Sequence, residues 1–378
     1  MPDIFSDFKM TLPVAQHEQI TAFLRQQVQS GALAAGARLP TTQELARRLG
    51  VTVTVIQAAL APLVREGLLL RRPRVGTVVR ERSPMLSRVG LYRISDPTRE
   101  GADHFSRRLA AVMAAQLATR GIATELFTDL RPEDQRTAPW DHLMQAIRTG
   151  RIDAVIGCES EARVHPWLAH LSVPLVIYGA PGFANGLGHD TGQFGRDGIA
   201  CLAARGCRSA GLVSVYPLDK TELDGSLSSS NDLYHGFMDA AASAGITTNP
   251  AWICTPPHDT FLPETRAERF GYDGIRAMWS GPQRPEGLVV FTDLAARGVI
   301  MGLLSCLSDD QPKPHLALHR NSELGLFCPL PADFLDVSLT DLAATLIDRL
   351  ERQRQGETLT WMVMPFIKHA AALVVPGV

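Results

Sequence analysis

The chain has 378 residues, with 45% hydrophobic and 20% charged side chains and a formal net charge of −2 at pH 7. It is too long for one small domain and too apolar for a disordered protein, so we expect two or three packed units. The charge is uneven, because residues 1–82 hold eleven Lys and Arg against six Asp and Glu, whereas the remainder holds 26 against 33. A basic head therefore precedes an acidic body, which excludes a uniformly basic or acidic protein.

The amino-terminal sequence MPDIFSDFKM has neither the basic start nor the apolar core of a signal peptide. No run approaches the roughly 18 apolar residues that a membrane helix requires, so we expect a cytoplasmic protein. The cysteines show no CxxC spacing, which favours buried thiols in a reducing compartment over disulfides or a zinc site. They are Cys158, Cys201, Cys207, Cys254, Cys306 and Cys328.

The first predicted element is a helix in which Ile20, Phe23, Leu24 and Val28 recur at helical spacing and which ends at Gly31. A loop, ALAAGARLP, leads from it to the next helix.

Two short helices with a three-residue turn are predicted between positions 41 and 66. Thr41 or Thr42 can cap the first, Gly50 supplies a left-handed stop, and Thr52 can cap the second, which runs from about 53 to 66. The apolar stripe of the second helix comprises Ile56, Ala59, Leu60, Leu63 and Val64. An apolar strand at 68–70, a basic tip at 71–76 and a return strand at 77–79 then predict a hairpin. This order of elements is that of a winged helix-turn-helix, which indicates DNA binding.

Four parts of this region follow a family pattern: QITAFLRQQVQSGALAAGARLP, LPTTQELARRLGV, AL…L..EGLL and Gly76-Thr77. Over about seventy residues they resemble the GntR family of bacterial repressors. The resemblance implies that the second helix of the motif enters the major groove while the wing tip lies along the minor groove, usually from a dimer facing a near-palindrome. The candidate DNA-contacting residues are Thr41, Gln43, Arg48, Thr52, Val53, Thr54, Gln57, Arg72, Arg74, Gly76 and Thr77.

Three positions depart from the family pattern, which places arginines where this chain has Gln43, Val53 and Gln57. Pro62 also lies inside the predicted recognition helix, where it removes a hydrogen bond to Ala58 and costs roughly 3 kcal/mol if unrelieved. Gln reads adenine and valines contact thymine methyls, so an A/T-leaning site is one compensation. The alternative is a sensor or scaffold whose head has lost specific DNA binding.

After Arg82 a polar link, SPMLS, leads into a segment with a different pattern, in which short apolar runs alternate with amphipathic stretches. Strand candidates are 88–94, 123–128, 153–157, 174–179, 210–215, 251–255, 287–292 and 315–320. Helix candidates lie near 103–119, 140–148, 161–170, 192–205, 231–244, 264–280 and 294–307. The alternation predicts an α/β body with two parallel sheets, each covered on both faces. We therefore expect a head at 1–82, a linker at 83–87 and a body at 88–378.

The stretch HDTGQFGRDGIACLAARGCRSAGLVS resembles the sensor domain of the lactose-repressor family, which is similar to periplasmic sugar-binding proteins. The resemblance extends to about 290 residues, through Gly236-Phe237, PEGLVVFTDLAARGVIMGLL and the closing segment 342–368. It implies two lobes joined by three crossovers, with an effector, most often a sugar, in the cleft between them. GntR heads occur on such sensors in arabinose-type repressors. A homodimeric, ligand-responsive repressor with no cofactor is therefore expected.

Effectors of such sheets bind outside the carboxyl ends of the strands. Asp293, after GLVVFT, either accepts hydroxyl hydrogen bonds from a ligand or caps the following helix. Arg320 either donates a bidentate pair of hydrogen bonds to a ligand or pairs with Glu323. The family's sugar-clasping arginine is Leu233 here, and its usual Gly-Tyr/Phe-Asp turn is replaced by residues 319–321. The candidate effector-binding residues are Arg93, Asp96, Phe105, Tyr178, Asp190, Trp252, Asp293 and Arg320.

No motif of a common enzyme class occurs, since GxSxG, GxxxxGK[ST], HExxH and a full GxGxxG are all missing from the sequence. The pair Gly186 and Gly188 lacks the third glycine of a dinucleotide turn. His165 and His170 are five residues apart, which fits no usual metal spacing on a helix. We therefore expect neither an enzyme nor a metal site.

Overall fold

The computed structural model describes residues 8, 15–29, 32–72, 75–79, 86–94, 104–158, 165–179, 183–216, 229–256, 264–308 and 310–370. Gly31, Arg74 and Asp96, which the sequence singled out, lie outside the described residues, as do positions 83–85 of the expected linker.

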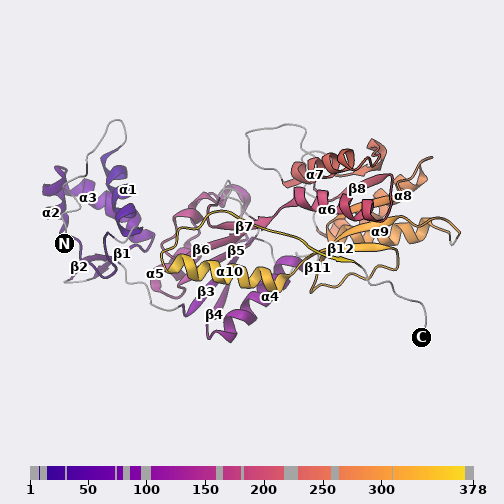
Figure 1. The fold of residues 1–378 in the computed structure, drawn as a ribbon. Helices are drawn as coiled ribbons and strands as arrows, with labels where there is room; N and C mark the ends of the chain where they lie inside the picture. Colours follow the sequence, from indigo (N-terminus) through magenta and orange to yellow (C-terminus); the bar gives the residue numbers. More distant parts are fainter. Residues whose placement is uncertain are drawn as a thin grey trace.

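The head lies at one end of the molecule, followed by two larger lobes (Figure 1). Its elements are α1 (Gln16–Gln29), α2 (Thr42–Leu49), α3 (Val53–Arg65), β1 (Leu69–Arg72) and β2 (Gly76–Val79). Gly50 ends α2 with φ of 64°, and α1 packs against α3 through side chains such as Ile20, Leu24 and Leu60. The predicted order of helix, turn, helix and hairpin is confirmed.

Pro62 does not break α3, which continues to Arg65. The Glu66 N–H donates to the Pro62 carbonyl at 2.8 Å, so the helical pattern resumes directly after the proline. Pro62 lies in the last turn, and the first two turns of α3 are unaffected by its missing N–H.

Lobe 1 is built on a six-stranded sheet in which every neighbouring pair is parallel. In order across the sheet its strands are β13 (Met362–Met364), β7 (Gly186–His189), β6 (Leu175–Tyr178), β5 (Ala154–Cys158), β3 (Arg88–Arg93) and β4 (Ala123–Thr128). Helices α4 (His104–Thr119) and α10 (Leu339–Arg354) pack on one face. Helix α5 (Asp141–Thr149) and the 3-10 helix η2 (Pro166–His170) pack on the other.

Lobe 2 is built on a second six-stranded sheet, which is parallel except at one edge, where β14 runs antiparallel to β12. Its strands are β14 (Ile367–Ala370), β12 (Ala332–Val337), β11 (His315–Asn321), β10 (Gly287–Phe291), β8 (Ala210–Ser214) and β9 (Ile253–Cys254). Helices α6 (Thr191–Ala204) and α7 (Ser229–Ser243) cover one face, while α8 (Glu264–Ser280) and α9 (Asp293–Cys306) cover the other. The short helices η1 (Glu133–Gln135) and η3 (Pro250–Trp252) lie in connections of lobes 1 and 2.

Three crossovers join the lobes. The chain passes from β7 to α6, from β12 to α10 and from β13 to β14, each time moving between the two sheets (Figure 1). The expected α/β fold, with a winged head and two parallel-dominated sheets, is therefore confirmed.

Two predicted elements are shorter than expected. Of the helix near 161–170, the structure shows only η2, and positions 161–164 lie outside the described residues. The strand at 251–255 is reduced to two residues in β9, because η3 occupies its beginning.

Within the described ranges, no single helix has the length and apolar composition needed to cross a membrane.

Candidate functional site

Helix α3 of the head buries its apolar stripe and exposes its opposite face. The exposed face carries Val53, Thr54, Gln57, Ala58 and Ala61. Gln43, on the preceding helix α2, is exposed. The candidates on these two helices therefore lie on the solvent side of the motif, as a helix that enters a DNA groove requires.

Both threonines at the helix starts act as caps. Thr41 Oγ1 accepts a hydrogen bond from the Glu44 N–H at 3.2 Å, and Thr52 Oγ1 accepts one from the Val55 N–H at 3.3 Å. These hydroxyls stabilise the starts of α2 and α3. Arg48 forms an ion pair with Glu44 at 2.6 Å, which offsets part of its positive charge.

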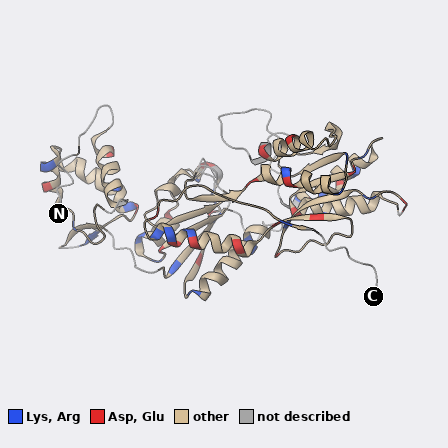
Figure 2. Ribbon diagram, viewed as in Figure 1, with Lys and Arg blue, Asp and Glu red and all other residues tan. Residues whose placement is uncertain are grey.

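The hairpin of β1 and β2 gathers three arginines. In its antiparallel register Arg71 is opposite Thr77 and Arg72 is opposite Gly76. Arg38 joins the hairpin through a bridge to β2, and its side chain passes Gly76, where an added Cβ would lie 3.5 Å from Arg38 Nε. Figure 2 shows arginine positions on α2 and on this hairpin, and both α2 and β1 contact α3.

In the body, a row of aromatic rings connects the two lobes at the carboxyl ends of their strands. On the lobe 1 side, Phe105 contacts Tyr178 with ring centroids 5.3 Å apart, and Tyr178 OH is hydrogen-bonded to His189 Nδ1 at 3.1 Å. Phe366, in the third crossover, lies 5.1 Å from the His189 ring. On the lobe 2 side Phe366 contacts three further rings, those of Phe194, Phe291 and His319. The ends of β6, β7, β10 and β11 therefore converge on one region.

A buried polar network lies at this region in lobe 2. The Asp293 N–H donates to His319 Nδ1 at 3.2 Å, and Asn321 Nδ2 donates to Asp293 Oδ2 at 3.0 Å. Asn321 is 3% exposed and its Oδ1 has no hydrogen-bond partner among the described residues. A buried acceptor without a partner is costly, so this oxygen is available to a hydroxyl or amide donor.

The two histidines of the region are neutral at pH 7. Burial, and secondarily the neighbouring His319, lowers the pKa of His189 to about 4. Burial also lowers the pKa of His319, although Asp293 and Asp336 oppose the shift. Because Nδ1 of neutral His319 accepts a hydrogen bond, its proton is on Nε2, which makes that atom a donor.

The Arg320 side chain is paired with a residue of lobe 2 itself. It forms a bidentate ion pair with Asp336 on the neighbouring strand, at 2.9 and 2.6 Å, and its guanidinium lies 4.0 Å from the centre of the Phe334 ring. The structural partner of Arg320 is thus Asp336 and not Glu323, which accepts hydrogen bonds from the first backbone N–H groups of α10 instead.

The remaining effector candidates lie in different surroundings. Trp252 is 6% exposed, precedes β9 at the amino end of that strand, and donates its indole N–H to the Gln283 carbonyl. Asp190 caps α6 and pairs with Arg196 at 3.2 Å. Arg93 is buried at the carboxyl end of β3. Of the candidates, the structure brings Phe105 and Tyr178 into the aromatic row, which Asp293 joins through the His319 contact.

Sequence reasoning missed several residues of this region. They are His189, Phe291, His319, Asn321 and Phe366. The first four lie at the ends of predicted or observed parallel strands, so strand-end position was the available signal. Phe366 lies between two short strands, and no local pattern marks it.

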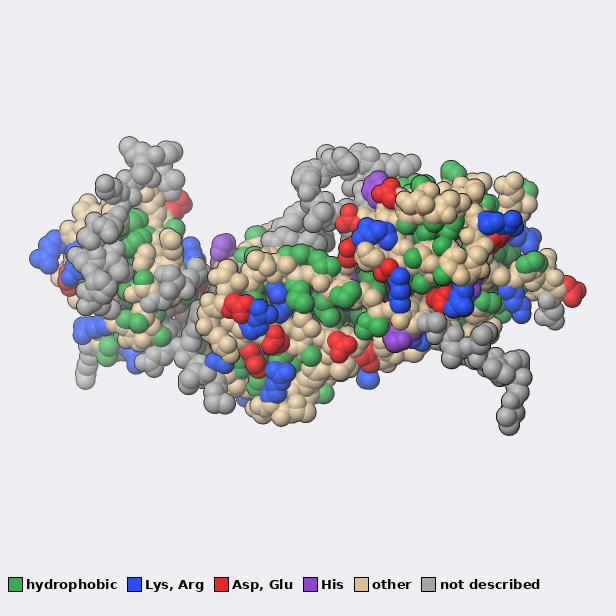
Figure 3. All heavy atoms as spheres, in the orientation of Figure 1, with side chains coloured by type: hydrophobic (Ala, Val, Ile, Leu, Met, Phe, Trp, Pro, Cys, Tyr) green, Lys and Arg blue, Asp and Glu red, His purple; other side chains and the backbone are tan. Residues whose placement is uncertain are grey.

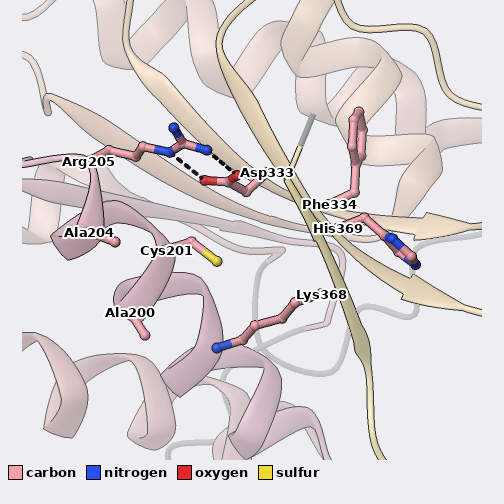
Figure 4. A pocket seen from close by; sticks show the side chains of 8 residues that line it. All are labelled: Ala200, Cys201, Ala204, Arg205, Asp333, Phe334, Lys368 and His369. Atoms are coloured by element: carbon pink, nitrogen blue, oxygen red, sulfur yellow. Dashed lines mark hydrogen bonds and ion pairs between the residues drawn. The ribbon is translucent and has the colours of Figure 1, made fainter. Parts of the chain in front are cut away.

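A pocket of about 450 Å³ lies elsewhere on lobe 2, between α6 and the strands β12 and β14 (Figure 4). Its residues are Ala200, Cys201, Ala204, Arg205, Asp333, Phe334, Lys368 and His369. Arg205 pairs with Asp333 at 2.8 Å and Lys368 pairs with Asp197 at 2.8 Å. Asp333 is near the amino end of β12, so this pocket is not at the carboxyl edge, and its Arg and Lys charges are already compensated.

Charged side chains of both signs are interspersed over the face of the lobes seen in Figure 3. The described residues contain no group of three or more His, Cys, Asp or Glu side chains that could hold a metal ion.

Residues 16–79 match the family model for bacterial regulatory proteins of the gntR family. No curated protein matches this chain. Among solved structures, the body is similar to a putative transcriptional regulator LacI from Bacillus cereus subsp. cytotoxis NVH 391-98, at 16% identity and a TM-score of 0.55, over 76% of this chain and 99% of that one.

Two further similar structures hold ligands. A periplasmic binding protein/LacI transcriptional regulator from Alkaliphilus metalliredigens QYMF, complexed with D-xylulofuranose, is 18% identical with a TM-score of 0.53, over 76% of this chain and 99% of that one. The Cra transcriptional dual regulator from Pseudomonas putida, in complex with fructose 1-phosphate, is 18% identical with a TM-score of 0.53, over 75% and 98%. At these identities the likeness establishes the two-lobed fold of the body.

Proposed function

We propose that this chain, which joins a GntR-type DNA-binding head to a body with the fold of LacI-type regulators, is a transcriptional repressor controlled by a small molecule. The observation that carries the proposal is the combination itself: a winged helix-turn-helix with an exposed second helix, followed by two lobes joined by three crossovers. We assign the DNA-binding head to 1–82, the linker to 83–87 and the effector-binding body to 88–378.

The effector site of this proposal is the region where the strand ends of both lobes converge. Asp293 offers a carboxylate, Asn321 an unpaired carbonyl oxygen, and His319 an Nε2 donor. The aromatic row supplies ring faces, on which the apolar face of a sugar stacks. Hydroxyl donors, hydroxyl acceptors and a flat apolar face together describe a neutral sugar or polyol.

Lobe closure supplies the mechanism. A ligand that contacts both the Tyr178 end of lobe 1 and the Asp293 end of lobe 2 binds the closed arrangement more tightly than the open one, and so shifts the population toward closure. Rotation about the three crossovers moves lobe 1, to which the head is attached in sequence, relative to lobe 2. In a homodimer that reads two half-sites, this rotation changes the spacing of the heads and lowers operator affinity.

A second candidate function is a small-molecule sensor or scaffold whose head no longer binds specific DNA. The uncharged face of α3, with Gln57 and Val53 where the family pattern has arginines, favours this alternative. The three arginines at the hairpin favour retained DNA binding, because Arg contacts to phosphates supply most of the sequence-independent affinity.

The test uses the full chain and a pool of random duplexes in about 50 mM salt, a condition in which phosphate contacts are strong. The proposal predicts binding and enrichment of an inverted repeat, with loss of that binding when a sugar that raises the melting temperature is added. The scaffold alternative predicts that the sugar binds while no duplex sequence is enriched.

A further inference from the structure

The exposed face of α3 carries no charged side chain over its first three turns. From position 53 to position 64 every residue is apolar, small, hydroxyl-bearing or an amide, and the first charge is Arg65 in the last turn. Val53 is 36% exposed at the start of the helix. Gln57 is the one side chain on this exposed face with both a hydrogen-bond donor and an acceptor in a planar amide.

The orientation of this face is fixed by the rest of the head. The Thr52 cap sets where α3 begins, and buried Ile56, Ala59 and Leu63 anchor one side of the helix to the core. Residues 53, 54 and 57 then lie together at the amino-terminal half of the opposite side. In helix-turn-helix proteins this half of the second helix contacts base edges in the major groove.

The chemistry of the face selects among base pairs. Guanine is most often read by Arg or Lys, which donate two hydrogen bonds to its O6 and N7 atoms. An amide donates to N7 and accepts from the N6 amino group of adenine, so Gln57 matches an A·T pair. Apolar groups such as the Val53 methyls contact the C5-methyl of thymine.

Positive charge lies outside this face. Arg71 and Arg72 lie on β1, Arg38 lies against β2, and Arg47 is exposed on α2. Helix α2 and strand β1 both contact α3, so these arginines stand on elements next to the exposed helix, and sequence-independent affinity and base reading are assigned to different elements.

We propose that α3 reads A·T pairs at the centre of each operator half-site, with Gln57 as the adenine-reading residue and Val53 as the thymine-methyl contact, while the arginines of the hairpin and α2 hold the phosphates. This inference rests on the proposed DNA-binding function and specifies which sequence class the head recognises.

The first test is selection of bound duplexes from the random pool with the full-length protein. The expected result is an inverted repeat whose half-sites have A·T pairs at the position aligned with α3. In the Gln57→Arg variant that position should change to G·C, because Arg replaces the amide pair with guanine contacts. Gln26→Arg adds the same charge on α1, away from the exposed face of α3, and should leave the selected sequence unchanged.

The second test removes single atoms from the selected duplex. Replacing the contacted adenine by 7-deazaadenine removes N7 and should weaken wild-type binding at least about fivefold, while the Gln57→Ala variant should be insensitive. Replacing the contacted thymine by uracil removes the methyl group, and Val53→Ala should abolish sensitivity to that change.

The outcomes separate the two proposals. Enrichment of G·C pairs at the α3 position, or equal sensitivity of wild type and Gln57→Ala to 7-deazaadenine, overturns the assignment of α3 but leaves DNA binding intact. Failure of the full chain to enrich any sequence overturns the proposed function itself.

Discussion

Asn321 Nδ2 donates a hydrogen bond to Asp293 Oδ2 at 3.0 Å, which ties the last residue of β11 to the first residue of α9. Both residues are buried, and the second oxygen of Asp293 accepts the Leu294 N–H at 3.0 Å. The carboxylate is therefore held in one orientation at the carboxyl edge of the lobe 2 sheet. A fixed carboxylate beside an unpaired amide oxygen is a preorganised place for hydroxyl groups.

Asp293→Ala should remove the response to sugar without removing DNA binding. A panel of neutral monosaccharides is titrated against the full chain, and a sugar that raises the wild-type melting temperature should leave that of the variant unchanged. DNA affinity without sugar should stay within about twofold, because the head is not altered. Asp273→Ala, which removes an exposed carboxylate on α8, is the matched control and should keep the response. An unaltered melting shift in Asp293→Ala would exclude this carboxylate from the site.

The hairpin arginines should set the salt dependence of DNA binding. In the Arg71→Ala, Arg72→Ala double variant, the slope of log affinity against log salt should become shallower by about 0.9 for each phosphate that is no longer neutralised, and affinity should drop for all duplex sequences alike. Arg276→Ala on α8 removes an arginine from lobe 2 and should leave the slope unchanged. A slope equal to the wild type in the double variant would count against the hairpin as a phosphate-binding element.

Arg320→Met should destabilise the protein by about 3 kcal/mol, because it leaves the Asp336 carboxylate, 3% exposed, without its bidentate partner. Urea unfolding provides the measurement. Arg352→Met removes a partner of Glu357 at the surface, where solvent screens the ion pair, and should cost much less. Similar losses of unfolding free energy in the two variants would show that the buried ion pair contributes no more to stability than the exposed one.

Acidification should destabilise the folded chain through His189. Its folded pKa of about 4 is below the ordinary 6.5, so between these values the unfolded chain binds a proton that the folded chain does not. Stability therefore falls as pH is lowered through this window, by about 1–2 kcal/mol between pH 6.5 and 5. His189→Gln should flatten this part of the curve of unfolding free energy against pH, and an identical curve would refute the assignment.

The head was predictable almost residue by residue, because its signals are local. Thr41, Gly50 and Thr52 fix helix ends through side-chain caps and a left-handed glycine, and these act within four residues of sequence. The alternation of apolar runs in the body likewise predicted most strands of both sheets.

The strands that were missed depend on distant partners. Strand β12 contains Asp333 and Asp336, residue types that are depleted in strands. The structure accommodates them because Arg205, from the end of α6, and Arg320 pair with these carboxylates. For Asp333, burial opposes ionisation, but the hydrogen bonds from Arg205 and His315 outweigh it and hold its pKa below the usual value.

Strand β7 also depends on a distant partner. Gly186 and Gly188 give no strand signal, yet the Trp361 ring lies where their Cβ atoms would be, with an added Cβ at Gly186 only 2.7 Å from it. The paired glycines considered as a dinucleotide turn thus make room for a tryptophan from a distant part of the chain. The candidate site was only partly predictable for the same reason, since Asn321 and His319 acquire their roles from contacts with Asp293.

Whether the body and the head are coupled is measured by the affinity of the full chain for its selected duplex, determined by fluorescence anisotropy with and without each sugar of the panel. A sugar that raises the melting temperature should also weaken duplex binding at least about fivefold, a usual size for coupling between sites. A sugar that stabilises the protein while the duplex affinity stays constant, or a panel in which no sugar changes either quantity, would contradict this coupling.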